Sequence, residues 1–178
     1  AYNAIKGGGI MLIESGYSRQ RAVNYALRWA LSRNPRYYDF EDIGGDCTNF
    51  VSQCLYAGSG VMNYSGDYGW DYISQDDRAP AWTGVEYLQR FLLNNDGTAV
   101  YGERTELSGL RPGDVIQLRN DEGRFYHTML VSFVFYPARP ENIYTCSHTY
   151  DARNRLLSSY NYSAAQGIRI LGARREMN

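Results

Sequence analysis

The residue best suited to covalent chemistry is Cys47, within Gly-Gly-Asp-Cys-Thr-Asn-Phe-Val-Ser-Gln-Cys at residues 44–54. The two glycines predict a tight turn, and Asp46 is a candidate helix N-cap that could also support the thiol. Apolar residues then recur at helical spacing, so we expect a helix from Cys47 to about Gly58. Unpaired N–H groups and the dipole at a helix N-terminus lower a thiol pKa and favour a thiolate nucleophile. The alternative is that Cys47 is one more buried apolar residue.

A cysteine nucleophile needs a base, and the chain has two histidines, His127 and His148. They lie on two predicted strands, residues 126–135 and 143–148, which form a hairpin. With the turn centred just after Pro137, the register places His127 directly opposite His148 on one face of the sheet. The same register pairs Met129 with Cys146 and Val131 with Tyr144. This face is apolar beyond His127, so we expect the cysteine helix to pack on it.

Cys47, His127 and His148 are therefore the candidate catalytic residues: a nucleophile, a general base and a polar group that orients the base. Asp151, just beyond the second strand, is an alternative third member or a partner for His148. The backbone N–H of Cys47 is a candidate oxyanion donor, and a second donor is left unassigned.

Two other chemistries use the same residue types. Cys47, both histidines and Asp151 would be acceptable zinc ligands, but no pair shows the short spacing of common zinc sites. The acidic residues at 39–46 could supply paired carboxylates for glycoside hydrolysis, although a cluster of loop acids is weak support. We expect neither a metal nor another cofactor.

Composition limits the function classes. The 178 residues are 44% hydrophobic and 21% charged, with a net charge of −1, which is typical of one soluble globular domain. There is no basic excess of the kind that nucleic-acid binding requires, and no apolar run long enough for a membrane helix. Three cysteines do not predict a disulfide framework. We interpret residues 1–16 as a leader or a vector-derived remnant, excluding 1–10 from fold reasoning, and 17–178 as a single domain.

The remaining pattern predicts helices first and strands afterwards. A helix is expected from Arg19 to Arg33, with Ser18 as its N-cap. Thr83-Gly84-Val85-Glu86 matches a capping box for a helix that ends near Asn94. Further strands are expected at residues 115–118, 156–162 and 168–173. This order indicates an α+β domain, with N-terminal helices packed on a mostly antiparallel sheet.

The stretch at residues 58–81 has many aromatic and acidic residues and no sustained period, so we expect an ordered cleft wall. Trp70 in this stretch, together with Trp82, is a candidate substrate-binding residue. Trp82 also occupies a hydrophobic-staple position opposite Tyr87, which is a structural alternative.

The motif around Cys47 resembles the bacterial putative amidase domain, amidase family six, of the papain-like, NlpC-like cysteine hydrolases. The likeness covers nearly all of residues 17–175. It rests on these segments: Tyr17-Ser18-Arg19, Ala22 to Ala26, Arg33-Asn34-Pro35 with Tyr38, Trp82-Thr83, Pro112 to Val115, His127-Thr128 and His148 to Asp151. The resemblance implies a papain-like fold, with Cys47 as nucleophile, His127 as general base and His148 as the third polar residue. It also implies amide hydrolysis in cell-wall peptides, commonly outside the membrane.

We therefore expect a cysteine-dependent amide or peptide hydrolase that forms an acyl-thioester on Cys47. Its expected substrate is a peptide or small amide, with peptidoglycan fragments favoured. The alternatives are an acyltransferase on the same fold, or a catalytically silent module that binds wall peptides or a protein. A secreted or cell-envelope location follows from the resemblance, while the lack of a visible signal peptide leaves a cytoplasmic one open. The oligomeric state is not predicted.

Overall fold

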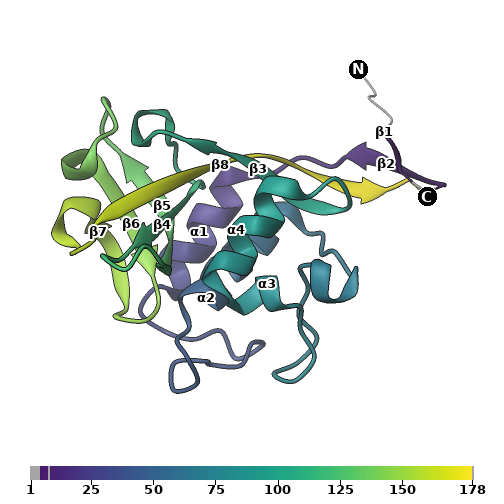
Figure 1. Cartoon of the computed structure of the whole chain (residues 1–178), viewed down its shortest axis with the longest axis horizontal. Coiled ribbons are helices and arrows are strands. Elements are labelled where there is room, and N and C mark those ends of the chain that lie inside the picture. Colours follow the sequence, from purple (N-terminus) through teal and green to yellow (C-terminus); the bar gives the residue numbers. More distant parts are fainter. Residues whose placement is uncertain (1–4, 8, 178) are drawn as a thin grey trace.

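The computed structural model describes residues 5–7 and 9–177. In these residues, helices pack against one face of an eight-stranded sheet (Figure 1). The α-helices are α1 (Arg19–Trp29), α2 (Cys47–Ser59), α3 (Pro80–Thr83) and α4 (Val85–Asn94). The strands are β1 (Ile5–Gly7), β2 (Ile10–Glu14), β3 (Ala99–Thr105), β4 (Val115–Arg119), β5 (Phe125–Val134), β6 (Ile143–Ser147), β7 (Ala152–Leu156) and β8 (Ala164–Glu176). Short 3₁₀ helices are η1 (Gly66–Tyr68), η2 (Leu107–Gly109), η3 (Pro140–Asn142) and η4 (Leu157–Ser159).

The strands follow the order β1-β2-β8-β4-β5-β6-β7, with β3 also paired to β8. All of these pairings are antiparallel, so the predicted α+β class with a mostly antiparallel sheet is confirmed. The 13-residue strand β8 runs the length of the molecule and pairs with β2, β3 and β4 (Figure 1). None of the helices in the described residues is long and apolar enough to span a membrane.

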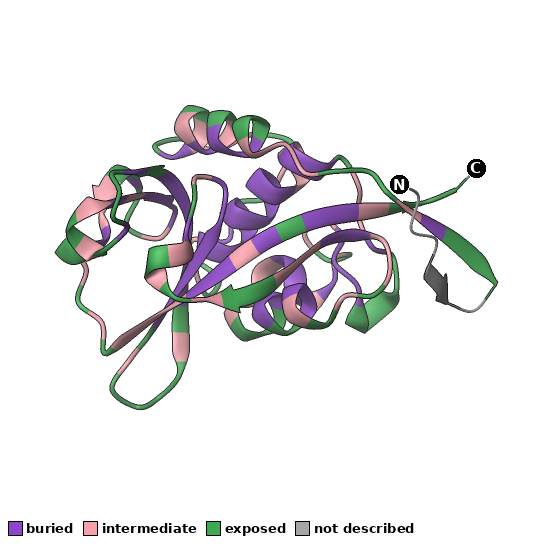
Figure 2. Ribbon diagram, turned by 90° about the horizontal axis from the view of Figure 1, so that it is seen from above, coloured by how far each residue is buried: buried purple, intermediate pink, exposed green. Residues whose placement is uncertain are grey.

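The sheet separates two hydrophobic clusters, and buried residues gather where the helices meet the sheet (Figure 2). The first cluster, called the helix-side core, joins α1, α2 and α4 to the near face of the sheet; it includes Ala22, Phe50, Cys54, Leu88, Leu130 and Cys146. The second, called the far-side core, lies on the opposite face; it includes Leu110, Ile116, Leu118, Met129, Val131 and Leu157. A side chain on β4, β5 or β6 therefore meets one core or the other, according to its place in the strand.

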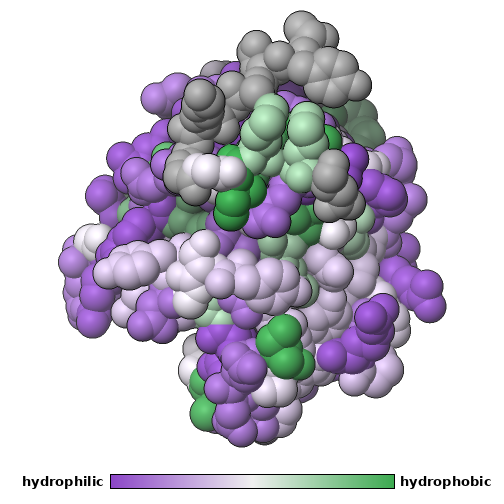
Figure 3. All heavy atoms as spheres, turned by 90° about the vertical axis from the view of Figure 1, so that its right-hand side faces the viewer, coloured by the Kyte–Doolittle hydropathy of each residue, from purple (hydrophilic) through white to green (hydrophobic). Residues whose placement is uncertain are grey.

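The segment before residue 17 is part of the sheet where it is described. Strand β2 pairs with the end of β8, and the Ser15 N–H donates to the Ala173 carbonyl. Residues 5–7 and 10–15 therefore take part in the sheet, whereas the interpretation of residues 1–16 as a leader or remnant stays a prediction; residues 1–4 and 8 lie outside the described residues. Figure 3 looks onto this end of the molecule, where hydrophobic atoms gather on an otherwise largely hydrophilic face.

Helix boundaries differ from the expectation where tertiary contacts intervene. Helix α1 ends at Trp29, four residues before Arg33, and the Trp29 carbonyl accepts from a histidine ring described below. The capping box is wrong: Thr83 ends α3, and its hydroxyl accepts from Arg78 Nε at 3.1 Å. The strand expected at residues 156–162 is replaced by the end of β7 and by η4.

The Pro-Gly-Asp turn at residues 112–114 ties α1 to the sheet. The Asp114 carboxylate is fully buried and accepts from Arg19 Nη1 at 2.7 Å. It also accepts from the backbone N–H groups of Ile170 and Arg111. A buried carboxylate with these partners fixes the start of β4 against α1 and β8.

We expect Asp114→Ala to lower the free energy of unfolding by about 3 kcal/mol, because it leaves Arg19 partly buried without its partner. Glu141→Ala is the matched control, since its contact with Arg139 is exposed on both sides and contributes less than about 1 kcal/mol. Urea denaturation of both variants measures the difference. Equal losses in the two variants would contradict this account.

Candidate active site

Cys47 is the first residue of α2 and follows a turn in which Gly44 and Gly45 have φ of +98° and +99°. These values lie in the region open mainly to glycine, so the predicted turn and helix start are confirmed. The Cys47 side chain is 7% exposed, and its Sγ lies 3.8 Å from Thr48 Oγ1. Thr48 in turn bonds Thr128 on β5 at 2.9 Å between hydroxyl oxygens, which holds the first turn of α2 on the sheet.

Asp46 does not cap the helix through its side chain, contrary to the expectation. Instead, Oδ1 accepts from the Phe40 backbone N–H at 2.9 Å and from Asn49 Nδ2 at 2.8 Å. The other oxygen, Oδ2, lies 2.5 Å from Nδ1 of His148. The Asp46 carboxylate bonds His148 rather than the N–H groups of the helix start because a fully buried carboxylate needs charge-assisted hydrogen bonds, and the imidazole supplies one.

His148 is therefore engaged at both ring nitrogens. Its Nε2 lies 2.8 Å from the Trp29 carbonyl, which can only accept, so Nε2 carries a hydrogen. The ring is 1% exposed and stacks on Phe50 of α2 with centroids 4.1 Å apart. These contacts join the ends of α1 and β6 to the start of α2, so His148 positions the segment that carries Cys47.

The predicted register of the hairpin is wrong, and His127 does not face His148. Cys146 pairs with Leu130 rather than Met129, and Tyr144 pairs with Phe133 rather than Val131. The shift grows from one residue to two because the pairing is irregular between Val131 and Phe133. A one-residue slip moves every side chain to the other face of a strand.

His127 consequently lies on the face of β5 away from α2. It pairs with Leu118 of β4, which belongs to the far-side core, and the centroid of its ring lies 5.9 Å from that of Tyr160. Thr128 and Leu130 take the helix-side positions that were expected for His127 and Met129. Burial, with a smaller contribution from the Arg155 charge, lowers the pKa of His127 from 6.5 to about 4. The imidazole is therefore neutral at physiological pH.

The thiol is not acidified as the helix-terminus argument predicts. Burial raises the pKa of Cys47 above its ordinary value, and the nearby Asp46 carboxylate acts in the same direction. Hydrogen bonding to the backbone of Thr128 and to Thr48 lowers the pKa, but by less. The Thr128 backbone adjoins His127 in sequence, so the thiol lies beside the His127–Thr128 peptide although the imidazole ring lies on the other face.

Asp151 does not contact His148 and instead pairs with Arg33, whose Nη1 lies 2.8 Å from Asp151 Oδ2. Arg33 also lies 3.2 Å from Asp39, 3.3 Å from Glu41 and 3.6 Å from Asp46. Burial lowers the pKa of Arg33, but its bonds to Asp151 and Asp39 outweigh this and raise it overall. Arg33 therefore pairs with Asp39, Glu41 and Asp46, three of the loop acids considered above as paired catalytic carboxylates.

Trp70 and Trp82 are fully buried, so neither presents its ring to a substrate, which corrects that expectation. Trp82 Nε1 donates to Asn49 Oδ1, and Trp70 Nε1 donates to the Ser52 hydroxyl, each at 2.9 Å. Two large aromatic residues can be buried here because each polar N–H finds a partner on α2.

The sequence reasoning missed Asn49, Thr128 and Arg33 as residues that hold the site. Asn49 links Asp46, the Tyr38 carbonyl and Trp82. The available signal was a polar residue within the apolar stripe of a helix, because such a residue is buried only with partners. Within the described part of the chain, no three His, Cys, Asp or Glu residues converge to hold a metal ion.

A family model described as "Putative amidase domain" matches residues 16–171. The chain belongs to this amidase family. Membership supports an amide-hydrolysing activity.

Two relatives from Bacillus subtilis (strain 168) are similar to this amidase-family chain. The uncharacterized protein YhbB is 36% identical over 118 residues, which is 65% of this chain and 37% of YhbB. The uncharacterized protein YjcM is 31% identical over 125 residues, which is 66% of this chain and 28% of YjcM. The chain thus spans about a third of the length of these relatives. No solved structure matches it significantly.

We predict that His127 makes the free energy of unfolding fall as the pH is lowered. Between pH 6.5 and about 4 the unfolded chain binds a proton at this ring while the folded protein does not, so stability falls as pH falls. His127→Gln should reduce this loss by about 3 kcal/mol. Thermal unfolding of both proteins across this pH interval measures the slope, and an unchanged slope would refute the assignment.

We also predict the order in which the thiols react. Cys47 is partly accessible, whereas Cys54 and Cys146 are fully buried, so Cys47 should be alkylated first. Because the thiolate is the reactive form and the pKa is raised, its rate should keep rising with pH beyond neutrality. Peptide mass spectrometry after stoichiometric iodoacetamide reports the site, and preferential labelling of Cys54 would contradict the structure.

Proposed function

We propose that this domain is a cysteine-dependent amide hydrolase of papain-like type that acts on peptides, with peptidoglycan peptides as its substrate. The observation that carries the proposal is Cys47 on the first turn of α2, rigidly held in a chain of the amidase family. A nucleophile placed on a helix N-terminus has backbone N–H groups beside it that can stabilise a developing oxyanion.

In the proposed reaction the Cys47 sulfur attacks the amide carbon while its proton passes to a neutral imidazole. The Cys47 backbone N–H donates a hydrogen bond to the developing oxyanion. Collapse of the tetrahedral species expels the amine, which takes the proton, and leaves an acyl-thioester. Water, deprotonated by the same imidazole, then releases the acid and restores the thiol.

His127 is the proposed base. His148 has both nitrogens committed to Asp46 and Trp29, whereas the His127 ring is neutral at physiological pH. Because the ring lies on the face of β5 opposite α2, rotation of the side chain alone does not bring it to the thiol, and the proposal requires the β5 backbone at residues 126–127 to turn. The pairing of β4 with β5 is irregular beside His127, where Tyr126 is skipped, and such bulges commonly re-aim a side chain at active sites. His148 acts in this proposal by holding Asp46 and the helix start.

The proposal predicts that Cys47→Ala abolishes turnover. Purified peptidoglycan fragments are incubated with the wild type and the variant, and mass spectrometry detects the new amine and carboxylate. Cys146→Ala is the matched control, since it removes a buried thiol of the helix-side core and should leave the folded protein active. Turnover that survives Cys47→Ala would overturn the proposal, and products formed on an added amine would indicate acyl transfer.

The same assay distinguishes the roles proposed for the two histidines. His127→Gln should lower kcat/KM by at least about 100-fold, the usual contribution of general acid–base catalysis, at unchanged folding. His148→Gln should instead lower the melting temperature together with activity, because it removes contacts among α1, α2 and β6. Full activity in His127→Gln would exclude this residue as the base.

A further inference from the structure

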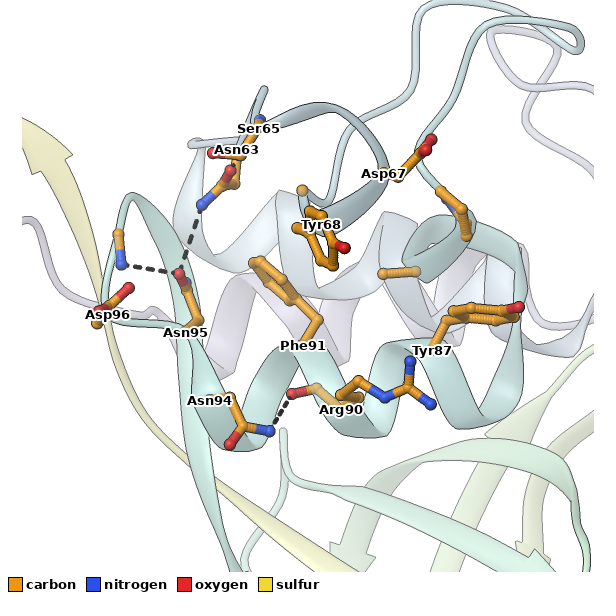
Figure 4. Close-up of a pocket in the computed structure, with 14 residues that line it drawn as sticks. Asn63, Ser65, Asp67, Tyr68, Tyr87, Arg90, Phe91, Asn94, Asn95 and Asp96 are labelled. Atoms are coloured by element: carbon orange, nitrogen blue, oxygen red, sulfur yellow. Dashed lines mark hydrogen bonds between the residues drawn. The ribbon is translucent and has the colours of Figure 1, made fainter.

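A pocket of about 820 Å³ has a lining that does not include Cys47 (Figure 4). Helix α4 forms one wall through Tyr87, Arg90, Phe91 and Asn94, and the turn that follows it contributes residues 95–97. The opposite wall comes from η1 and its neighbours, through Ser65, Asp67, Tyr68 and Gly69. Its lining also includes Asn63, which lies beyond the C-terminal end of α2, whereas Cys47 is the first residue of that helix.

The pocket presents aromatic rings to solvent. Tyr68 is 89% exposed and Tyr87 is 52% exposed. Phe91 is 7% exposed, and its ring stacks on that of Trp70 with centroids 5.9 Å apart. Figure 4 shows the labelled Tyr68, Phe91 and Tyr87 side chains among the residues that line the pocket. The two tyrosine rings therefore offer exposed flat surfaces to a ligand, and Phe91 forms the part of the pocket that rests on the core.

The polar groups around these rings fall into two sets. The amides of Asn63 and Asn95 are used internally, in bonds to each other and to the Thr98 carbonyl, and they shape the wall. Asp67 and Asp96 line the pocket without a hydrogen bond to another residue drawn there (Figure 4). Arg90 extends along Tyr87 with its guanidinium carbon 5.6 Å from the ring centre. Two carboxylates and one cation thus remain available to a ligand.

We propose that this pocket binds a saccharide. A pyranose ring has an apolar C–H face that can lie on Tyr68 or Tyr87. In an oligosaccharide, the hydroxyl groups of different rings can donate to Asp67 and to Asp96, which lie at opposite ends of the pocket (Figure 4). A phosphorylated or other anionic ligand would meet two carboxylates against one arginine, which disfavours it. A purely apolar ligand would bury these carboxylates without partners, at a large cost. A hydroxyl-rich ring satisfies both the aromatic and the acidic groups.

The test titrates chitotetraose and cellotetraose into the purified wild-type protein, with calorimetry and tryptophan fluorescence as readouts. Fluorescence is informative because Phe91 of the pocket stacks on Trp70. We expect saturable binding of at least one oligosaccharide, and about tenfold weaker binding in Tyr68→Ala, since one aromatic contact is lost. Asp67→Asn should also weaken binding, because a neutral amide is a poorer acceptor than a carboxylate.

Tyr150→Ala is the matched control, since Tyr150 is 84% exposed and does not line the pocket. It should bind as the wild type does. The proposal is overturned if neither oligosaccharide binds up to about 10 mM, or if Tyr68→Ala binds as tightly as the control. The titration is repeated with Cys47→Ala, which should bind the oligosaccharide as the wild type does. Saccharide binding by a protein that does not hydrolyse amides would support this inference and contradict the proposed function, and hydrolysis without saccharide binding would do the opposite.

Discussion

The contact between the buried Asp46 carboxylate and the His148 ring is the interaction on which the candidate site depends. It joins the residue before Cys47 to the end of β6, and the other nitrogen of His148 reaches the carbonyl at the end of α1. Removing a carboxylate from water is costly unless hydrogen bonds and charge compensate. Here the Phe40 backbone, Asn49 and His148 provide that compensation, so three separate elements are fixed around one thiol.

The other polar residues of the motif extend this arrangement through the core. Asn49 and Ser52 hold the indole N–H groups of Trp82 and Trp70, and Thr48 reaches Thr128 on the sheet. Most of α2 is buried. Its buried Thr48, Asn49, Ser52 and Gln53 side chains are tolerated in the core because each makes a hydrogen bond. The same Trp70 supports Phe91 at the aromatic pocket, so one packed layer connects the nucleophile to a second concave surface.

Local structure was largely predictable. The glycine turn, the start of α2 at Cys47 and the antiparallel sheet agree with the sequence pattern, because backbone freedom and apolar periodicity act over a few residues. The carboxylate partner of His148 was not predictable in the same way. Asp151 is three residues away in sequence, yet Arg33 binds it, and Asp46 from a distant segment takes its place. Which carboxylate binds His148 is therefore decided by the charges that the fold brings close together, and not by distance along the sequence.

The sequence by itself determined that a thiol begins a core helix and that two histidines lie on neighbouring strands of an α+β domain. Only the tertiary structure decided which faces those histidines occupy. An irregularity near Ser132 changes the hairpin register, and with a side-chain period of two residues that shift places Thr128 toward α2 and His127 toward the far-side core. Such a shift is set by the packing of both strands against their cores, which no local pattern encodes.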